Sequence, residues 1–204
     1  MKLSHFKLTI CAVLFLSVSS AVAQMPQPFS ADYSTTISNG GEKSAGKMYF
    51  SAPKMRMDHT ARGQSVTMIM DSATQVMYMV MPAQRMYMVM DAKARPLGGL
   101  SAPKPPTAFD PSHPCSADAT CKKVGTETIN GRVCDKWVTT DKNGTSTAWI
   151  DQKLLFPIKA MTSNGYVLEL SNIKEGRPDP SVFEVPAGYR KMDMSGMIGG
   201  QKPH

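Results

Sequence analysis

Apolar and polar side chains alternate with a period of two along most of this 204-residue chain. That period is typical of a half-buried β-strand, whereas an amphipathic helix repeats every 3.6 residues or so. No helical stripe longer than two turns is present. The alternation predicts strands at residues 29–38, 45–52, 54–61, 65–72, 122–129, 132–140, 145–151, 154–161 and 166–174. The fold class is therefore expected to be mainly β.

The stretch "MYMVMPAQRMYMVM", residues 77–90, contains six methionines in fourteen positions and predicts a β-hairpin. Pro82 suits the second position of a type I turn, and four-residue hairpin loops are commonly built around such a turn. If Met81 faces Met86, then Met79 faces Met88 and Met77 faces Met90. All six methionines then lie on one face of the sheet.

Consecutive hairpins imply a curved antiparallel sheet, or half-open β-barrel, of about ten strands. "NG" at Asn130 and Gly131 is a strong signal for one of these hairpins. Residues 92–114 are rich in proline and glycine and predict a loop that crosses one face of the sheet or forms a flap. We expect one domain over residues 24–192, followed by a disordered tail at 193–204.

The first 23 residues have the layout of a secretory signal peptide, with a basic start, the apolar run "LTICAVLFLSV" and a small-residue site ending at Ala23. No other long apolar run follows, so no transmembrane span is predicted. The formal charge falls from +7 to +5 without Lys2 and Lys7, and the remaining basic residues are scattered. We expect a periplasmic or secreted protein that does not bind nucleic acid.

Removal of the signal peptide leaves Cys115, Cys121 and Cys134. An oxidising compartment favours one disulfide, and Cys115–Cys121 is the expected pair. Cys121–Cys134 is the alternative, because a hairpin can bring those two residues together. Zinc is disfavoured, since His113 is the one nearby histidine and its spacing is poor.

No sequence signature of an enzyme appears, whether a nucleophile elbow, a zinc-protease motif, a phosphate loop or a dinucleotide fingerprint. We therefore expect no catalytic residues and no cofactor. Asp58, Asp71 and Asp91 each follow methionines in a predicted strand, and we expect them to face water at strand ends.

The second half of the chain resembles a family of secreted bacterial proteins catalogued only as a domain of unknown function. The resemblance rests on "KVGTETINGRVCDKW", "AWID", "LLFPIKA" and "NIKEGRPDPSVFEVPAGYRKM", and "MDSATQVMYMVMPAQRMYMVM" fits the same layout. Those proteins are similar to the lipoprotein carriers LolA and LolB, whose curved antiparallel sheet wraps around a hydrophobic cavity. The resemblance covers most of residues 29–192. It implies a LolA-like fold in which "VFEVPAGY" ends the sheet.

The methionines allow two functional interpretations. Thioethers are soft ligands that prefer Cu(I) or Ag(I), and His59 is the histidine nearest to the hairpin in sequence. Methionine also adapts to varied apolar partners, and this interpretation needs no further ligand. We expect a non-enzymatic protein that binds a lipid or acyl chain, with soft-metal binding or an envelope protein partner as alternatives. The predicted ligand-binding residues are Met68, Met70, Met77, Met79, Met81, Met86, Met88 and Met90.

Overall fold

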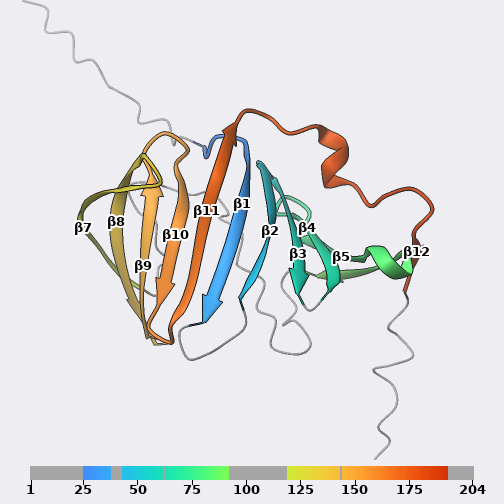
Figure 1. Ribbon diagram of the computed structural model, residues 1–204, viewed down its shortest axis with the longest axis horizontal. Coiled ribbons are helices and arrows are strands. Elements are labelled where there is room, and N and C mark those ends of the chain that lie inside the picture. The colour runs from blue at the N-terminus through green and yellow to red at the C-terminus, as the bar shows by residue number, and fades with distance from the viewer. Residues whose placement is uncertain (1–24, 38–42, 62, 92–118, 143, 193–204) are drawn as a thin grey trace, which may run out of the picture.

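The computed structural model describes residues 25–37, 43–61, 63–91, 119–142 and 144–192. Twelve strands form one curved sheet (Figure 1). The strands of the first half are β1 (Phe29–Ile37), β2 (Ser44–Ser51), β3 (Lys54–Ala61), β4 (Gln64–Asp71), β5 (Val76–Met81) and β6 (Met86–Asp91). Those of the second half are β7 (Thr120–Ile129), β8 (Arg132–Asp141), β9 (Gly144–Asp151), β10 (Phe156–Thr162), β11 (Tyr166–Glu175) and β12 (Arg190–Lys191).

Strands β1–β6 and strands β7–β11 each form a meander of antiparallel hairpins, and the order in the sheet is β12-β6-β5-β4-β3-β2-β1-β11-β10-β9-β8-β7. The pairing of β1 with β11 joins the halves, from Phe29 opposite Glu175 to Ile37 opposite Tyr166. The predicted fold class, a mainly β curved antiparallel sheet, is confirmed. The predicted crossing loop at 92–114 and the tail at 193–204 lie outside the described residues.

The hairpin turns follow from local sequence. Asn130 and Gly131 have φ values of 49° and 76°, as a two-residue type I′ turn between β7 and β8 requires. Between β5 and β6, Pro82 begins the short 3₁₀ turn η1 (Pro82–Gln84), and Arg85 closes it in the left-handed region with φ 51°. Both turns lie where the sequence predicts them.

The main core lies where the two halves meet on one face of the sheet. Phe29 on β1, Phe50 on β2 and Phe156 on β10 pack their rings with centroids 4.9–5.8 Å apart. Leu154, Ile158 and Leu170 from the second half and buried methionines from β2–β5 belong to the same cluster. Burial of such a side chain contributes about 1.5–3 kcal/mol, so this cluster is a major source of stability.

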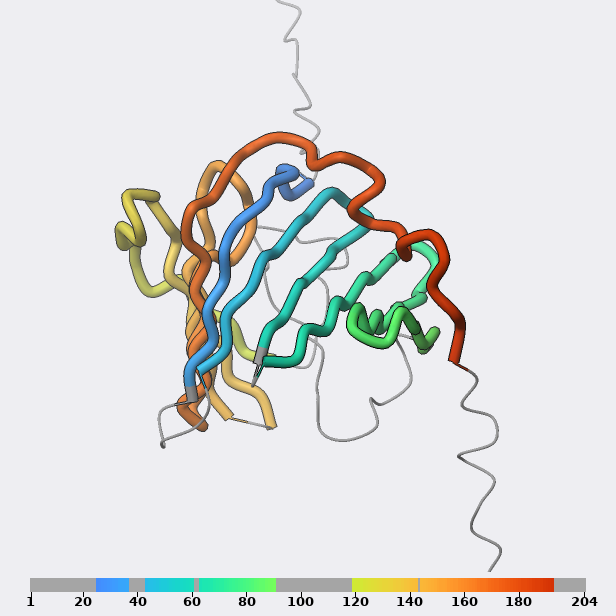
Figure 2. The backbone as a smooth tube through the Cα atoms, turned by 45° about the vertical axis from the view of Figure 1, so that its right-hand side comes forward, coloured from blue at the N-terminus to red at the C-terminus, as the bar shows by residue number. Residues whose placement is uncertain are grey.

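Contrary to what the resemblance implies, "VFEVPAGY" (residues 182–189) does not end the sheet, because this segment crosses the opposite face and leads to β12. Asp179 caps the turn η2 (Pro180–Phe183) by accepting a hydrogen bond from the Ser181 amide at 2.8 Å. Residues 176–192 then reach the far edge of the first half, where β12 pairs in parallel with β6 (Figure 2). We call residues 176–192 the C-terminal strap.

Candidate functional site

Methionines gather on one face of β2–β6, which we call the Met face. The antiparallel register aligns them across the strands, because directly opposite residues share a face. One row consists of Met48, Met57, Met68, Met79 and Met88. The next row consists of Met55, Met70, Met77 and Met90, and Phe50 extends it on β2.

The β5–β6 hairpin has the register that the sequence predicts, with Met77 opposite Met90, Met79 opposite Met88 and Met81 opposite Met86. All eight predicted ligand-binding residues therefore lie on the Met face. Met70 and Met77 are buried, and the other six, Met68, Met79, Met81, Met86, Met88 and Met90, are half-buried.

Three further methionines on this face, Met48, Met55 and Met57, were not predicted as site residues. All three are buried. The apolar residues that alternate in "KMYF" and "KMRM" indicate that these methionines face one side of a strand. The sequence does not show that β2 and β3 lie beside the methionines of β4–β6.

His59 also lies on the Met face, two residues from Met57 on β3 and opposite Gly46. Its Nδ1 lies 3.0 Å from Oη of Tyr33, and the two rings stack with an interplanar angle of 17°. Burial raises the pKa of the Tyr33 hydroxyl to about 12. Tyr33 therefore stays protonated at neutral pH and holds the imidazole in one orientation.

The opposite face of β4–β6 is apolar as well, and the C-terminal strap covers it. Phe183 packs against the buried Ile69 and Val80. Around them lie the half-buried Tyr49, Tyr78, Tyr87, Val182, Val185 and Tyr189. The strap therefore covers most of the apolar residues of this face, whereas Val89 on β6 is 39% exposed.

Asp58 helps to fix the strap. Its carboxylate accepts hydrogen bonds from Nε of Arg56 at 2.8 Å and from Oγ1 of Thr67 at 2.6 Å. Arg56 in turn donates to the Val182 carbonyl at 2.8 Å. The prediction that Asp58 faces water at a strand end is therefore wrong, because the strap covers this part of β3. Asp71 does lie at a strand end, where it accepts from the amides of Ala73 and Thr74.

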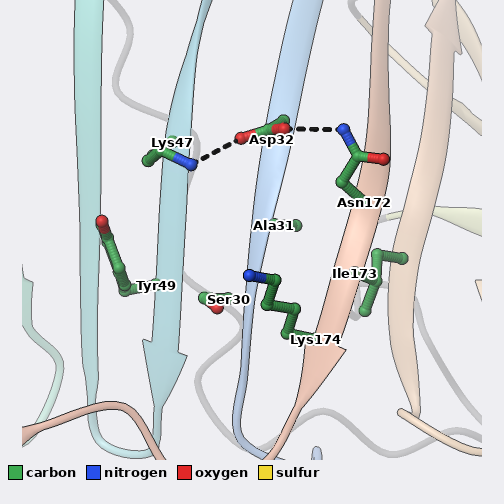
Figure 3. A pocket seen from close by; sticks show the side chains of 8 residues that line it. All are labelled: Ser30, Ala31, Asp32, Lys47, Tyr49, Asn172, Ile173 and Lys174. Carbon is green, nitrogen blue, oxygen red and sulfur yellow. Dashed lines mark hydrogen bonds and ion pairs between the residues drawn. The ribbon is translucent and has the colours of Figure 1, made fainter.

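A pocket of about 660 Å³ lies on the opposite face where β1, β2 and β11 meet (Figure 3). Asp32 lies between Lys47 and Asn172 in this pocket and accepts hydrogen bonds from Asn172 at 2.8 Å and from Lys47 at 3.0 Å. These two donors hold the pKa of the Asp32 carboxyl below its usual range. Asn172 adopts φ 49° where the β1–β11 register shifts. This pocket could not be predicted from the sequence, because it depends on an irregularity in the pairing of strands that are distant in sequence.

Cys121 and Cys134 lie on the two strands of the β7–β8 hairpin. Cys134 is a free, buried thiol. Cys121 lies opposite Thr139 and Cys134 lies opposite Glu127, so the two cysteines are far apart along the β7–β8 hairpin. The alternative Cys121–Cys134 disulfide is therefore excluded. Cys115 is outside the described residues, and the Cys115–Cys121 disulfide stays a prediction.

Within the described part of the chain, no three His, Cys, Asp or Glu side chains cluster as a metal site would require. Over the same residues, no helix is both long and apolar enough to cross a bilayer.

Comparison with known families and structures agrees with this architecture. The family model described as "Domain of unknown function (DUF4412)" matches residues 32–155. No protein with a curated description matches the sequence.

Several solved structures align with this chain. An uncharacterized conserved protein from Thermus thermophilus aligns with a TM-score of 0.57 and 9% identity, over 82% of this chain and 91% of that one. A chain of the Pseudomonas aeruginosa MucA/MucB complex aligns with a TM-score of 0.54 and 14% identity, over 79% of this chain and 56% of that one. A LolA superfamily protein from Nitrosomonas europaea aligns with a TM-score of 0.40 and 13% identity, over 79% of this chain and 92% of that one. At their low identities, the first two alignments show a similarity of fold alone.

Proposed function

This chain belongs to the family described as Domain of unknown function (DUF4412), and we propose that it is an exported, non-enzymatic protein that binds a lipid or acyl chain on its Met face. The observation that carries the proposal is the difference between the two faces of β4–β6. On the opposite face the C-terminal strap packs Phe183 against the buried Ile69 and Val80. On the Met face four methionines of β5 and β6 belong to neither buried cluster and stay half-buried, namely Met79, Met81, Met86 and Met88.

The chemistry of the Met face suits a flexible apolar ligand. Two adjacent rows of methionines form a continuous surface that spans five strands. The methionine side chain is unbranched and polarizable, so such a surface adapts to chains of different length and curvature. The buried Met48, Met55 and Met57 continue these rows at the β2–β3 end, where the surface merges with the main core.

A displacement assay with a fluorescent fatty acid tests the proposal. The Met79→Leu/Met88→Leu variant should keep its affinity, because leucine and methionine have similar volumes and such swaps cost less than about 1.5 kcal/mol in stability. The Met79→Asp/Met88→Asp variant should lose binding, because an unpaired charge would face the ligand.

Met161 supplies the matched control, since it is 41% exposed on β10, away from the methionine rows. Met161→Asp should leave fatty-acid binding unchanged, and circular dichroism should show that all variants are folded. The proposal is wrong if wild-type protein binds no fatty acid, or if the aspartate variant folds and binds as well as the wild type.

A protein partner is the second candidate, since one structural neighbour is a chain of the MucA/MucB complex. Native mass spectrometry of protein purified from its own envelope distinguishes the two candidates. A co-purified mass of a few hundred daltons that organic solvent extracts supports the lipid, and a polypeptide mass supports the partner. The same spectrum tests export, because cleavage after Ala23 gives a mature chain that begins at Gln24.

A further inference from the structure

Met57 and Met68 occupy adjacent places in the first methionine row, directly opposite each other on β3 and β4. Directly opposite residues of an antiparallel pair have Cβ atoms about 4.5–5.5 Å apart. Each methionine has three rotatable bonds beyond its Cα atom, so both sulfur atoms can reach one ion between the strands. Met57 is 5% exposed and Met68 is half-buried, which leaves the pair at the border between the core and the open part of the Met face.

His59 adds a nitrogen ligand to this pair. It lies on the same face, next to Met57 along β3 and diagonal to Met68 on β4. Side chains on such a diagonal are within reach of each other when they are long or aromatic. Oη of Tyr33 and Nδ1 of His59 form a hydrogen bond at 3.0 Å, and no described side chain forms a hydrogen bond with Nε2 of His59. Histidines that bind metals usually have their second ring nitrogen held by a hydrogen bond in this way.

We propose that Met57, Met68 and His59 bind a monovalent soft metal ion, Cu(I) or Ag(I). Two thioethers and one imidazole are neutral, soft to intermediate ligands, and thioether sulfur selects Cu(I) over harder cations. The site lacks the carboxylates that calcium or magnesium would need. This inference goes beyond the proposed lipid binding, and its three ligands do not include Met79 or Met88, so the Met79→Leu/Met88→Leu variant should keep the metal site intact.

The first measurement is the affinity of the purified full-length mature protein for Cu(I), by competition with a chromophoric Cu(I) chelator under anaerobic, reducing conditions. Silver nitrate in chloride-free buffer serves as a second probe that needs no reductant. We expect one ion per molecule. Met57→Leu/Met68→Leu should weaken binding by more than about 100-fold, because leucine has no sulfur. His59→Gln should also weaken it, and Tyr33→Phe should weaken it by roughly 10-fold, as is typical when a group that orients a metal-bound histidine is lost.

Met161→Leu is the matched control, because it removes one exposed thioether far from the site and should not change the affinity. NMR of protein labelled with ¹³C-methyl methionine provides a readout on the wild type itself. Silver should shift the methyl signals of Met57 and Met68 and leave that of Met161 unmoved. Absence of saturable binding, full affinity in the Met57→Leu/Met68→Leu variant, or unmoved Met57 and Met68 signals would overturn the proposal.

Discussion

Tyr33 and Gly46 lie opposite each other on β1 and β2, and the tyrosine ring fills the space that a side chain at position 46 would need. A Cβ atom added to Gly46 would lie 2.9 Å from Cε1 of Tyr33 and 1.7 Å from the carbonyl oxygen of Asp58. The second of these contacts is with backbone, which cannot rotate away. The glycine therefore permits both the close approach of β2 to β3 and the contact of Tyr33 with His59.

Gly46→Ala should for this reason destabilise the protein by at least about 1–3 kcal/mol, the usual cost of overpacking a filled site. Gly125→Ala on β7 is the control, because a Cβ atom there has no neighbour within 4 Å. Urea denaturation of both variants measures the difference in unfolding free energy. Equal midpoints for the two alanine variants would contradict the steric role of Gly46.

The local parts of this fold could be predicted from the sequence. A four-residue loop that begins at Pro82, between two alternating segments, fixes the register of the β5–β6 hairpin. A slip by one residue would move every methionine to the other face. Asn130 and Gly131 define the β7–β8 hairpin in the same way.

The non-local parts could not be predicted. An alternating strand does not reveal its partner, so the pairing of β1 with β11 and the parallel addition of β12 to β6 are absent from any local pattern. Because strand partners cannot be inferred from local sequence, the continuation of the methionine rows to Met48 and the contact of Tyr33 with His59 could not be predicted either. For the same reason, the packing of Phe183 against Ile69 and Val80 could not be predicted.

Phe183 is the apolar anchor of the C-terminal strap and is 6% exposed. Phe183→Ala should cost about 3–5 kcal/mol in unfolding free energy, as is typical for a buried phenylalanine. The same change should speed tryptic cleavage after Arg190, which is exposed at the C-terminal end of the strap. Glu184→Ala, at the exposed neighbour, should change neither stability nor cleavage. Intact resistance to trypsin in the Phe183→Ala variant would show that other contacts hold the strap.

Cys134 should react slowly with thiol reagents in the folded protein. Its side chain is fully buried, and burial raises the pKa of the thiol to about 11, so little of the reactive thiolate is present under mildly alkaline labelling conditions. We expect iodoacetamide to label one thiol per molecule rapidly in urea and only slowly without it. Non-reducing peptide mapping should find Cys115 joined to Cys121, and recovery of three labelled thiols in urea would refute that pairing.

Trp149 is 6% exposed on β9, and its Nε1 donates a hydrogen bond to Glu127 on β7 at 2.6 Å. Lys136 donates to the same carboxylate, also at 2.6 Å, and the ammonium groups of Lys136 and Lys159 lie 5.1 and 5.6 Å from the centroid of the Trp149 ring. The hydrogen bonds from Lys136 and Trp149 hold the pKa of the Glu127 carboxyl below its usual range.

A carboxyl group with a lowered folded-state pKa stabilises the protein above its unfolded-state pKa and loses this effect as the pH falls through the folded-state value. Glu127→Gln should therefore lower the urea midpoint at neutral pH, and the difference from the wild type should shrink as the pH falls below about 4.3, the ordinary pKa of a glutamate. In a Trp137→Phe background, in which Trp149 is the one remaining tryptophan, acid should shift the emission of the protein that keeps Glu127 and not that of the Glu127→Gln variant. An emission shift of equal size and midpoint in both proteins would assign the transition to a carboxyl group other than Glu127.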